Sequence, residues 1–279
     1  MTMRELSINT YGYIYSTPAA DCVRRLVDLG YCHFELMIHP PHLPIDGFSP
    51  EARRDLRAAI EAAGATIDSL NMPSLDHNLA SPLSRVRAAS VAMFSDAIDL
   101  AADLGVEWLV TVPGRMSPLF PPAPADRKTW ITESIETLIP RAEARGVGLA
   151  IENVPFASFP DAASLGDFVR GLGSPMLGVC YDAANAHFIG ESLTEGVACL
   201  ADLLRVAHLS DTNRQVWRHD RIGLGDVPVA EFARALDDAD FRGPCTLEII
   251  DSDPEGAVLD SHRAIESFGF APRRAGAAT

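Results

Sequence analysis

Four side chains with the chemistry of metal ligands lie at or near the ends of short apolar segments. Glu152 follows "VGLAI" and Asp182 follows "LGVCY", while His208 and Glu248 lie within "RVAHL" and "TLEII". Successive members are 30, 26 and 40 residues apart, each gap being about one strand-helix unit. Three carboxylates cannot share a small cavity with an imidazole unless a cation offsets their mutual repulsion. The pattern therefore predicts a divalent metal site.

The donor types indicate which metal would suit the site. Oxygen-rich ligation with one nitrogen favours Mn²⁺, Mg²⁺ or Co²⁺ over a thiolate zinc site. We expect one divalent ion, Mn²⁺ first, with Mg²⁺, Co²⁺ or Zn²⁺ as alternatives. Taken singly, Glu152 could be a surface charge, Asp182 a turn cap and His208 a core histidine. Glu248 is harder to explain in this way, because burying an unpaired carboxylate in an apolar strand costs several kcal/mol.

Such a site needs a scaffold that brings the ends of several strands together. Short apolar runs predict strands at 6–10, 33–38, 66–70, 107–112, 147–151, 177–181, 205–209 and 245–250. Apolar residues at three- and four-residue spacing predict helices at 18–30, 49–64, 84–105, about 126–145, 160–171, 192–203, 228–239 and 255–268. Strict alternation implies a parallel sheet, because parallel neighbours need a crossover.

Eight such units in 279 residues favour an α/β fold, a single (β/α)₈ TIM barrel. The alternative is an open doubly wound sheet, but the first strand-to-helix turn, "SINTYGYIYSTPAADC", has no G-x-G-x-x-G. We expect the barrel to span residues 1–270 and residues 271–279 to form a disordered tail. Active sites of TIM barrels lie at the carboxyl ends of the strands, where the four candidate ligands fall.

Composition narrows the classes of partner. The net charge of −15 opposes nucleic-acid binding, because such binding profits from clustered Lys and Arg. No apolar run approaches the roughly 20 residues that a membrane span needs, and "MTMRELSINT" does not read as a signal peptide. The scattered cysteines predict buried free thiols in a cytoplasmic protein; they are Cys22, Cys32, Cys180, Cys199 and Cys245.

Several motifs at these strand ends resemble a known family. The segments "IEN", "YDAANAH", "HLSDTNR", "GLGDVP" and "LEI" resemble the xylose isomerase-like TIM barrel superfamily, and most of all its sugar isomerase/epimerase branch with the ketose 3-epimerases. The resemblance implies a metal held by Glu152, Asp182, His208 and Glu248. It further implies that the two glutamates move the substrate proton.

The same resemblance suggests substrate-binding residues. Arg214, six positions after His208, matches a substrate-binding arginine of those epimerases. His187 lies near their substrate histidine, but Asn185 occupies the usual position, three residues after the metal aspartate. A carboxylate expected a few residues after the first metal glutamate is missing from "NVPFASFP". His219 either lines the barrel mouth or packs on a tryptophan.

Glu35, in "FELMI", either points into the barrel as an acid beside the ligands or pairs with a helix. A metal chelated by two oxygens of a hydroxy-ketone acidifies the adjacent C–H by stabilising an enediolate. Glu152 and Glu248 come from strands separated by two others, so they can act as acid and base on opposite sides of the substrate. Epimerisation and aldose–ketose isomerisation both fit this arrangement.

Three other functions start from the same residues. A metal-dependent dehydratase of a cyclic keto-polyol, such as an inosose or 3-dehydroshikimate, is the main alternative. An abasic-site endonuclease is less favoured, because its multi-zinc cluster needs more histidines. The last is a barrel that keeps its ligands only for structure. As partners we expect a small sugar or polyol substrate, with homo-oligomerisation left open, and neither nucleic acid nor membrane.

Overall fold

Eight parallel strands close into a barrel in the computed structural model, which describes residues 3–271. The strand order is β2-β3-β4-β5-β6-β7-β8-β1, and a further pairing of β1 with β2 closes the ring. The predicted TIM barrel is therefore confirmed, and the open doubly wound sheet is excluded. The eight strands are β1 (Arg4–Asn9), β2 (His33–Met37), β3 (Thr66–Met72), β4 (Trp108–Thr111), β5 (Gly148–Glu152), β6 (Leu177–Asp182), β7 (Leu204–Leu209) and β8 (Cys245–Leu247).

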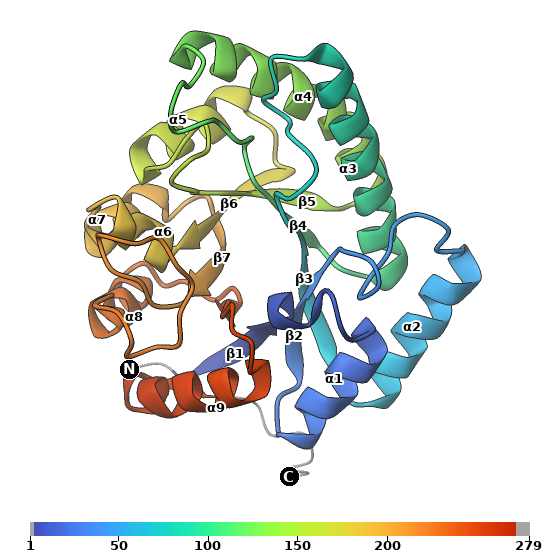
Figure 1. The fold of residues 1–279 in the computed structure, drawn as a ribbon, viewed down its shortest axis with the longest axis vertical. Coiled ribbons are helices and arrows are strands. Elements are labelled where there is room, and N and C mark those ends of the chain that lie inside the picture. The colour runs from blue at the N-terminus through green and yellow to red at the C-terminus, as the bar shows by residue number, and fades with distance from the viewer. Residues whose placement is uncertain (1–2, 272–279) are drawn as a thin grey trace.

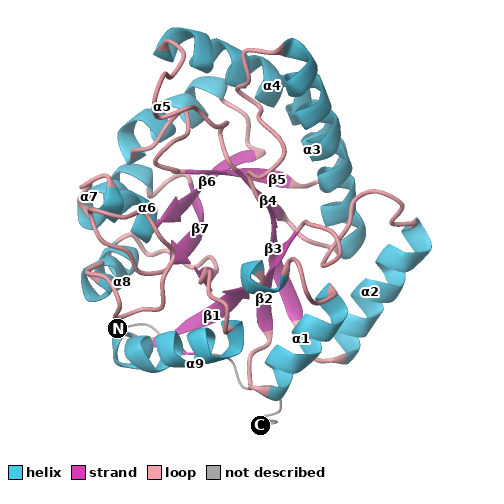
Figure 2. Ribbon diagram, in the orientation of Figure 1, coloured by secondary structure: helices cyan, strands magenta, loops and turns pink. Residues whose placement is uncertain are grey.

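Helices surround the barrel as an outer ring (Figure 1). They are α1 (Ala19–Asp28), α2 (Pro50–Ala62), α3 (Ser84–Leu104), α4 (Pro124–Arg145), α5 (Ala162–Leu172), α6 (Ala183–Phe188), α7 (Leu193–Leu200), α8 (Val229–Asp238) and α9 (Pro254–Ile265). Two 3₁₀ turns, η1 (Tyr11–Tyr13) and η2 (Glu266–Phe268), complete them. Figure 2 shows the loops that join strands to helices gathered over the barrel.

The helix boundaries follow local chemistry. The Ser49 hydroxyl accepts the amide of Ala52 and caps α2, whose first residue is Pro50. At the other end, Gly105 adopts φ +76° and caps α3, which an L-residue would do only under strain. None of the helices in the described part of the chain is long and apolar enough to cross a bilayer.

Two expectations differ from the structure, and two short elements were not predicted. The last barrel strand ends at Leu247, so Glu248 lies just beyond it instead of inside a strand. The sequence did not predict the short helix α6 or the strand β9 (Phe270–Ala271), because both have too few residues for a periodic apolar pattern. Four cysteines are buried free thiols as expected, but Cys199 is exposed. Apart from Ala271, the predicted tail lies outside the described residues.

The barrel interior is layered along the strands. Val110, Ala150, Cys180 and Val206 come from β4, β5, β6 and β7 and form one fully buried cluster. Because side chains alternate between the two faces of a strand, the residues two positions further along β5 to β7 also point inward. These positions include three of the four candidate ligands, so the apolar layer forms the floor of the site.

Candidate functional site

The four candidate metal ligands lie together at the carboxyl ends of the strands. Each offers one ligand atom, and the four atoms all lie within 4.8 Å of one another. The imidazole Nδ1 of His208 lies 3.2 Å from Glu248 Oε2, 3.6 Å from Glu152 Oε1 and 3.9 Å from Asp182 Oδ2. All four residues are buried. Chain segments almost 100 residues apart in sequence thus supply one compact set of donors.

Asp182 divides its two carboxylate oxygens between two tasks. Oδ1 accepts the amide of Asn185 at 2.5 Å and caps the short helix α6. Oδ2 is buried and has no hydrogen-bond partner among the described residues, although it faces the other ligands. A buried carboxylate oxygen without a partner is costly, and a bound cation would satisfy it. The donor set and this orphaned atom therefore fit a divalent metal.

Asn153 fixes the two ligand-bearing strands to each other. Its side-chain oxygen accepts the amide of Asp182 at 2.7 Å, and its side-chain nitrogen donates to the carbonyl of the same residue at 3.1 Å. Both contacts are fully buried, so the amide extends the pairing of β5 and β6 past the end of the strand. This role explains why a polar residue follows Glu152 at the end of an apolar strand.

Glu35 lies fully buried behind His208, as the first of its two sequence interpretations requires. The imidazole Nε2 lies 3.1 Å from Glu35 Oε2, which also accepts the hydroxyl of Ser69 at 2.6 Å. The other oxygen accepts the amides of Asn9 at 2.6 Å and Asn71 at 3.1 Å. Strand pairing aligns Asn9 with Glu35 and Glu35 with Ser69, so the sheet register builds this network.

The crowded charges shift the pKa values of these groups. Burial, opposed by the hydrogen bond with His208 and reinforced by Glu248, raises the pKa of Glu152 to about 7. Burial also raises the pKa of Asp182. At Glu248 burial favours the protonated form, but the His208 and His219 imidazoles outweigh it and lower the pKa to about 2. A divalent cation would lower the pKa values of these carboxyls, because positive charge favours the carboxylate.

Cys180 lies beside the four candidate ligands and is an alternative metal donor. Its thiol forms an alternative three-residue group with Glu152 and His208. Burial raises the pKa of Cys180 well above its ordinary value, so the side chain stays a thiol, whereas metals bind the thiolate. The set of three carboxylates and one imidazole is therefore the better metal site.

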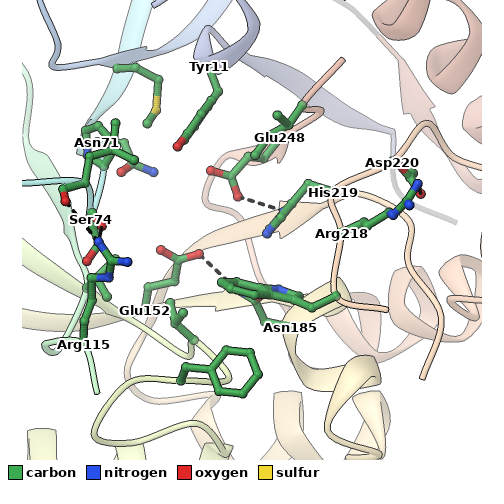
Figure 3. Close-up of a pocket in the computed structure, with 18 of the residues that line it drawn as sticks. Tyr11, Asn71, Ser74, Arg115, Glu152, Asn185, Arg218, His219, Asp220 and Glu248 are labelled. Carbon is green, nitrogen blue, oxygen red and sulfur yellow. Dashed lines mark hydrogen bonds and ion pairs between the residues drawn. The ribbon is translucent and has the colours of Figure 1, made fainter. Parts of the chain in front are cut away.

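A cavity of about 650 Å³ opens above the candidate ligands (Figure 3). Glu152 and Glu248 reach its base from different sides, and the Tyr11 side chain points between them. Burial raises the pKa of Tyr11 to about 12, so its hydroxyl remains a hydrogen-bond donor at neutral pH. His219 also lines the cavity, with Nδ1 3.0 Å from the hydroxyl of Ser210 and 3.4 Å from Glu248 Oε2.

Aromatic side chains form one wall of the cavity. The Trp217 indole nitrogen donates to the Asn185 side-chain oxygen at 2.6 Å, and the amide nitrogen of Asn185 donates to Glu152 Oε1 at 3.4 Å. Trp217 also makes edge contacts with Phe156 and His219, with ring centroids 5.5 and 6.0 Å apart. The wall and the acidic base are therefore joined by hydrogen bonds.

The four predicted substrate residues fall into two groups. Asn185 and His219 line the cavity, and His219 also packs on Trp217, so both of its sequence interpretations hold. His187 lies two residues further along α6 than Asn185, and its Nε2 contacts Asp226 Oδ1 at 2.7 Å outside the cavity. Arg214 is exposed in the loop after β7 and is not among the cavity-lining residues of the described chain. Its substrate role stays a prediction from the resemblance.

Arg115 and Tyr11 are two of the cavity residues that sequence reasoning missed. Arg115 lies in the loop between β4 and α4, and Tyr11 lies in the turn after β1. The signal for Arg115 was its place just after the strand-ending "VTVPG", because barrel sites form at such ends. For Tyr11, the turn between β1 and α1 contains three tyrosines, and nothing in their sequence distinguishes the one that points inward.

Comparison with known proteins agrees with this architecture. The sequence profile described as xylose isomerase-like TIM barrel matches residues 23–268. The chain belongs to this family.

Among curated proteins, fructoselysine 3-epimerase of Escherichia coli O157:H7 is 24% identical over 266 residues, covering 90% of this chain and 92% of the epimerase. Xylose isomerase of Thermus thermophilus is 25% identical over 267 residues, covering 84% and 69% of the two chains. Among solved structures, a D-psicose 3-epimerase in the presence of D-fructose superposes with a TM-score of 0.80 at 20% identity, covering 94% of this chain and 97% of that one.

Proposed function

We propose that this protein is a metal-dependent sugar isomerase or epimerase that acts on a ketose or related hydroxy-ketone through an enediolate. The observation that carries the proposal is the pair Glu152 and Glu248, which face one cavity from different sides above a cluster of metal-type donors. The relatives support the same class, since they include a sugar 3-epimerase and a sugar isomerase.

The metal would be held by Glu152, Asp182, His208 and Glu248, whose ligand atoms lie within 4.8 Å of one another. When bound, a divalent cation supplies Lewis acidity that favours negative charge on the oxygens of a hydroxy-ketone. We expect Mn²⁺, with Mg²⁺, Co²⁺ or Zn²⁺ able to replace it, because the donor set is oxygen-rich with one nitrogen. Asp182 Oδ2, which has no hydrogen-bond partner among the described residues, would gain a partner in this ion.

Proton transfer is the task of the two glutamates. A carboxylate removes the proton from the carbon beside the carbonyl, and the other carboxyl returns one to the same carbon or to its neighbour. Return on the opposite face of the same carbon gives epimerisation, and return to the neighbouring carbon gives isomerisation. Asn185 orients Glu152 through its 3.4 Å contact, and His219 orients Glu248 through its 3.4 Å contact. The Tyr11 hydroxyl is available to donate to a substrate oxygen.

The cavity suits a small carbohydrate. Its volume of about 650 Å³ lies within the range typical of small-molecule sites, and the lining mixes apolar side chains with convergent polar groups. The free cysteines support a reducing, cytoplasmic location. We therefore propose a small sugar or polyol as substrate.

Deuterium exchange tests the proposal. The Mn²⁺-loaded protein is incubated in D₂O with a panel of ketoses, keto-polyols and 3-dehydroshikimate, and the sugars are freed of metal on a chelating resin before NMR. An isomerase or epimerase introduces deuterium beside the carbonyl of at least one ketose, and the mass of the sugar changes only by this label. The Glu152→Gln variant should show only the spontaneous rate.

Two outcomes would contradict the proposal. Loss of one water from a cyclic keto-polyol, with no exchange into any ketose, would identify a dehydratase. Exchange in the Glu152→Gln variant at the parental rate would remove this residue from the proton path. Internal return of the same proton lowers the deuterium content, so product formation is measured in the same samples.

A further inference from the structure

The cavity that contains Glu152 and Glu248 is also lined by a basic side chain, Arg115. Arg115 and Ser74 form one wall, across the cavity from His219 and Arg218 (Figure 3). The volume of about 650 Å³ leaves room for a sugar with a substituent group, as pockets of this size hold drug-sized ligands. Arg115 therefore lines the same cavity as the glutamates, where a substituent group of a sugar could contact it.

Arg115 is held in place by the neighbouring backbone. Its Nη1 donates to the carbonyls of Ser74 at 2.7 Å and Leu75 at 3.0 Å. Its own amide donates to the Asn78 side-chain oxygen at 3.0 Å, and its carbonyl accepts the Asn78 side-chain nitrogen at 2.9 Å. These contacts join the loop after β4 to the loop after β3, so the guanidinium is positioned before any ligand arrives.

The adjacent glycine strengthens this positioning. Gly114 adopts φ +83°, and a Cβ on it would lie 2.3 Å from the Cβ of Ala80. Only glycine allows the two loops to approach so closely in this backbone conformation. The chain thus uses a tight contact to set the direction of the arginine that follows.

The charge of Arg115 has no ion-pair partner in the described part of the chain. Among residues 3–271, no carboxylate forms an ion pair with it, whereas Arg218 on the other wall lies 3.9 Å from Asp220. Nη1 is used by backbone carbonyls, while Nε and Nη2 make no hydrogen bond to the described residues. A guanidinium edge with two free donors matches the paired oxygens of a carboxylate or phosphate.

We infer that the substrate is a sugar carrying an anionic group, a phosphate ester or a carboxylate, which Arg115 binds at the cavity wall opposite His219 and Arg218. This inference rests on the proposed function, because that function determines which end of the sugar meets the glutamates. The base of the cavity would repel an anionic group through its own carboxylates, so the group is directed to the arginine wall.

Calorimetric titration tests this inference, because it measures binding affinity instead of turnover. The Mn²⁺-loaded protein is titrated with D-fructose, D-fructose 6-phosphate and D-fructuronate, and metal content is measured in the same samples. We expect one of the two anionic sugars to bind at least 10-fold more tightly than D-fructose. The phosphate and carboxylate titrations distinguish which group the site takes.

Arg115→Ala should weaken binding of the preferred anionic sugar 10- to 100-fold and leave the affinity for D-fructose and the metal content unchanged. Arg234→Ala is the matched control, because Arg234 is exposed on the outer helix α8. The inference is overturned if D-fructose binds as tightly as both anions, if neither anion binds, or if Arg115→Ala keeps the preference. If the deuterium test fails but the protein still prefers an anionic sugar, only the proposed reaction is refuted, and the inference about Arg115 stands.

Discussion

His208 and Glu35 contact each other inside the barrel, with the imidazole Nε2 3.1 Å from the carboxylate Oε2 and both side chains fully buried. Nδ1 of the same imidazole faces Glu152, Asp182 and Glu248. If a metal binds at Nδ1, the remaining imidazole proton is on Nε2, where the Glu35 carboxylate accepts it. Such a carboxylate–histidine contact orients a metal-binding imidazole and increases its basicity.

The first prediction follows from this contact. Glu35→Gln should weaken Mn²⁺ binding about 10- to 100-fold, because the neutral amide is a poorer acceptor for Nε2–H. Calorimetric titration of the metal-free protein measures the change. Thermal unfolding without metal is the control, since the near-isosteric amide should leave the fold intact. A dissociation constant equal to the parental value would show that Glu35 only fills the barrel interior.

The second prediction concerns metal content. The Glu152→Gln, Glu248→Gln double variant should retain no stoichiometric metal after mild purification, because it loses two of the three carboxylates. The thermal stability of its metal-free form reports two opposed changes, the loss of repulsion between the two glutamates and the loss of attraction between Glu248 and the His208 and His219 imidazoles. Elemental analysis and calorimetry measure the two effects.

A charge-matched control comes from the outer face of α4. Glu136→Gln, Glu143→Gln changes the net charge by the same amount at exposed positions. Its metal content should equal that of the parent. Unchanged metal content in the variant of the site itself would refute the ligand assignment.

The third prediction separates the two polar residues of α6. Asn185→Ala should lower kcat/KM by about 10- to 100-fold, equivalent to roughly 1.4–2.7 kcal/mol, because Asn185 contacts both Glu152 and Trp217. His187→Ala should change kcat/KM less than threefold, because His187 contacts Asp226 outside the cavity. Steady-state kinetics on one substrate compare the variants. A larger effect at His187 would restore the role that the family resemblance gave it.

The fourth prediction concerns pH and stability. Burial lowers the pKa of His77 below its ordinary value of 6.5, and its Nε2 is buried without a partner in the described residues. The folded state therefore binds fewer protons than the unfolded state, so the stabilisation is complete above pH 6.5 and is lost as the pH falls below it. The free energy of unfolding should fall by up to about 1.4 kcal/mol per pH unit from this group.

Urea unfolding between pH 7.5 and 5.0 measures this slope. His77→Leu, which keeps the apolar contact with Phe94, should show a shallower slope than the parent. The difference between the two slopes isolates His77 from other groups that titrate in this range. Equal slopes would mean that the His77 pKa is the same in the folded and unfolded states.

The barrel and its rim could be predicted because their signals are periodic. Eight apolar strands alternate with amphipathic helices, and the four candidate ligands recur at the strand ends, so topology alone gathers them. The contact between Glu35 and His208 was left open, because it depends on how β1, β2 and β3 are aligned around the closed barrel. A single strand carries no information about that register.

The cavity walls were harder to foresee because loops build them. Asn185 rather than His187 faces the cavity because two positions along a helix correspond to about 200° of rotation. The direction of Arg115 depends on contacts between two loops that are far apart in sequence. Neither relationship has a periodic pattern, so only the folded chain reveals them.

The two carboxylate oxygens of Asp182 have different roles: Oδ1 caps the start of α6, and Oδ2 faces the candidate ion site. Replacing Asp182 with a residue that cannot accept this hydrogen bond, as in Asp182→Ala, removes the cap of α6, whose residue Asn185 accepts the Trp217 indole through its side-chain oxygen. Asp182→Asn keeps an oxygen that can cap the helix and removes the negative charge, so a loss of activity in this variant is assigned to the candidate ion site. The aromatic wall and the candidate ion site are therefore connected through Asp182 and Asn185, so a ligand that orders one of them should also order the other.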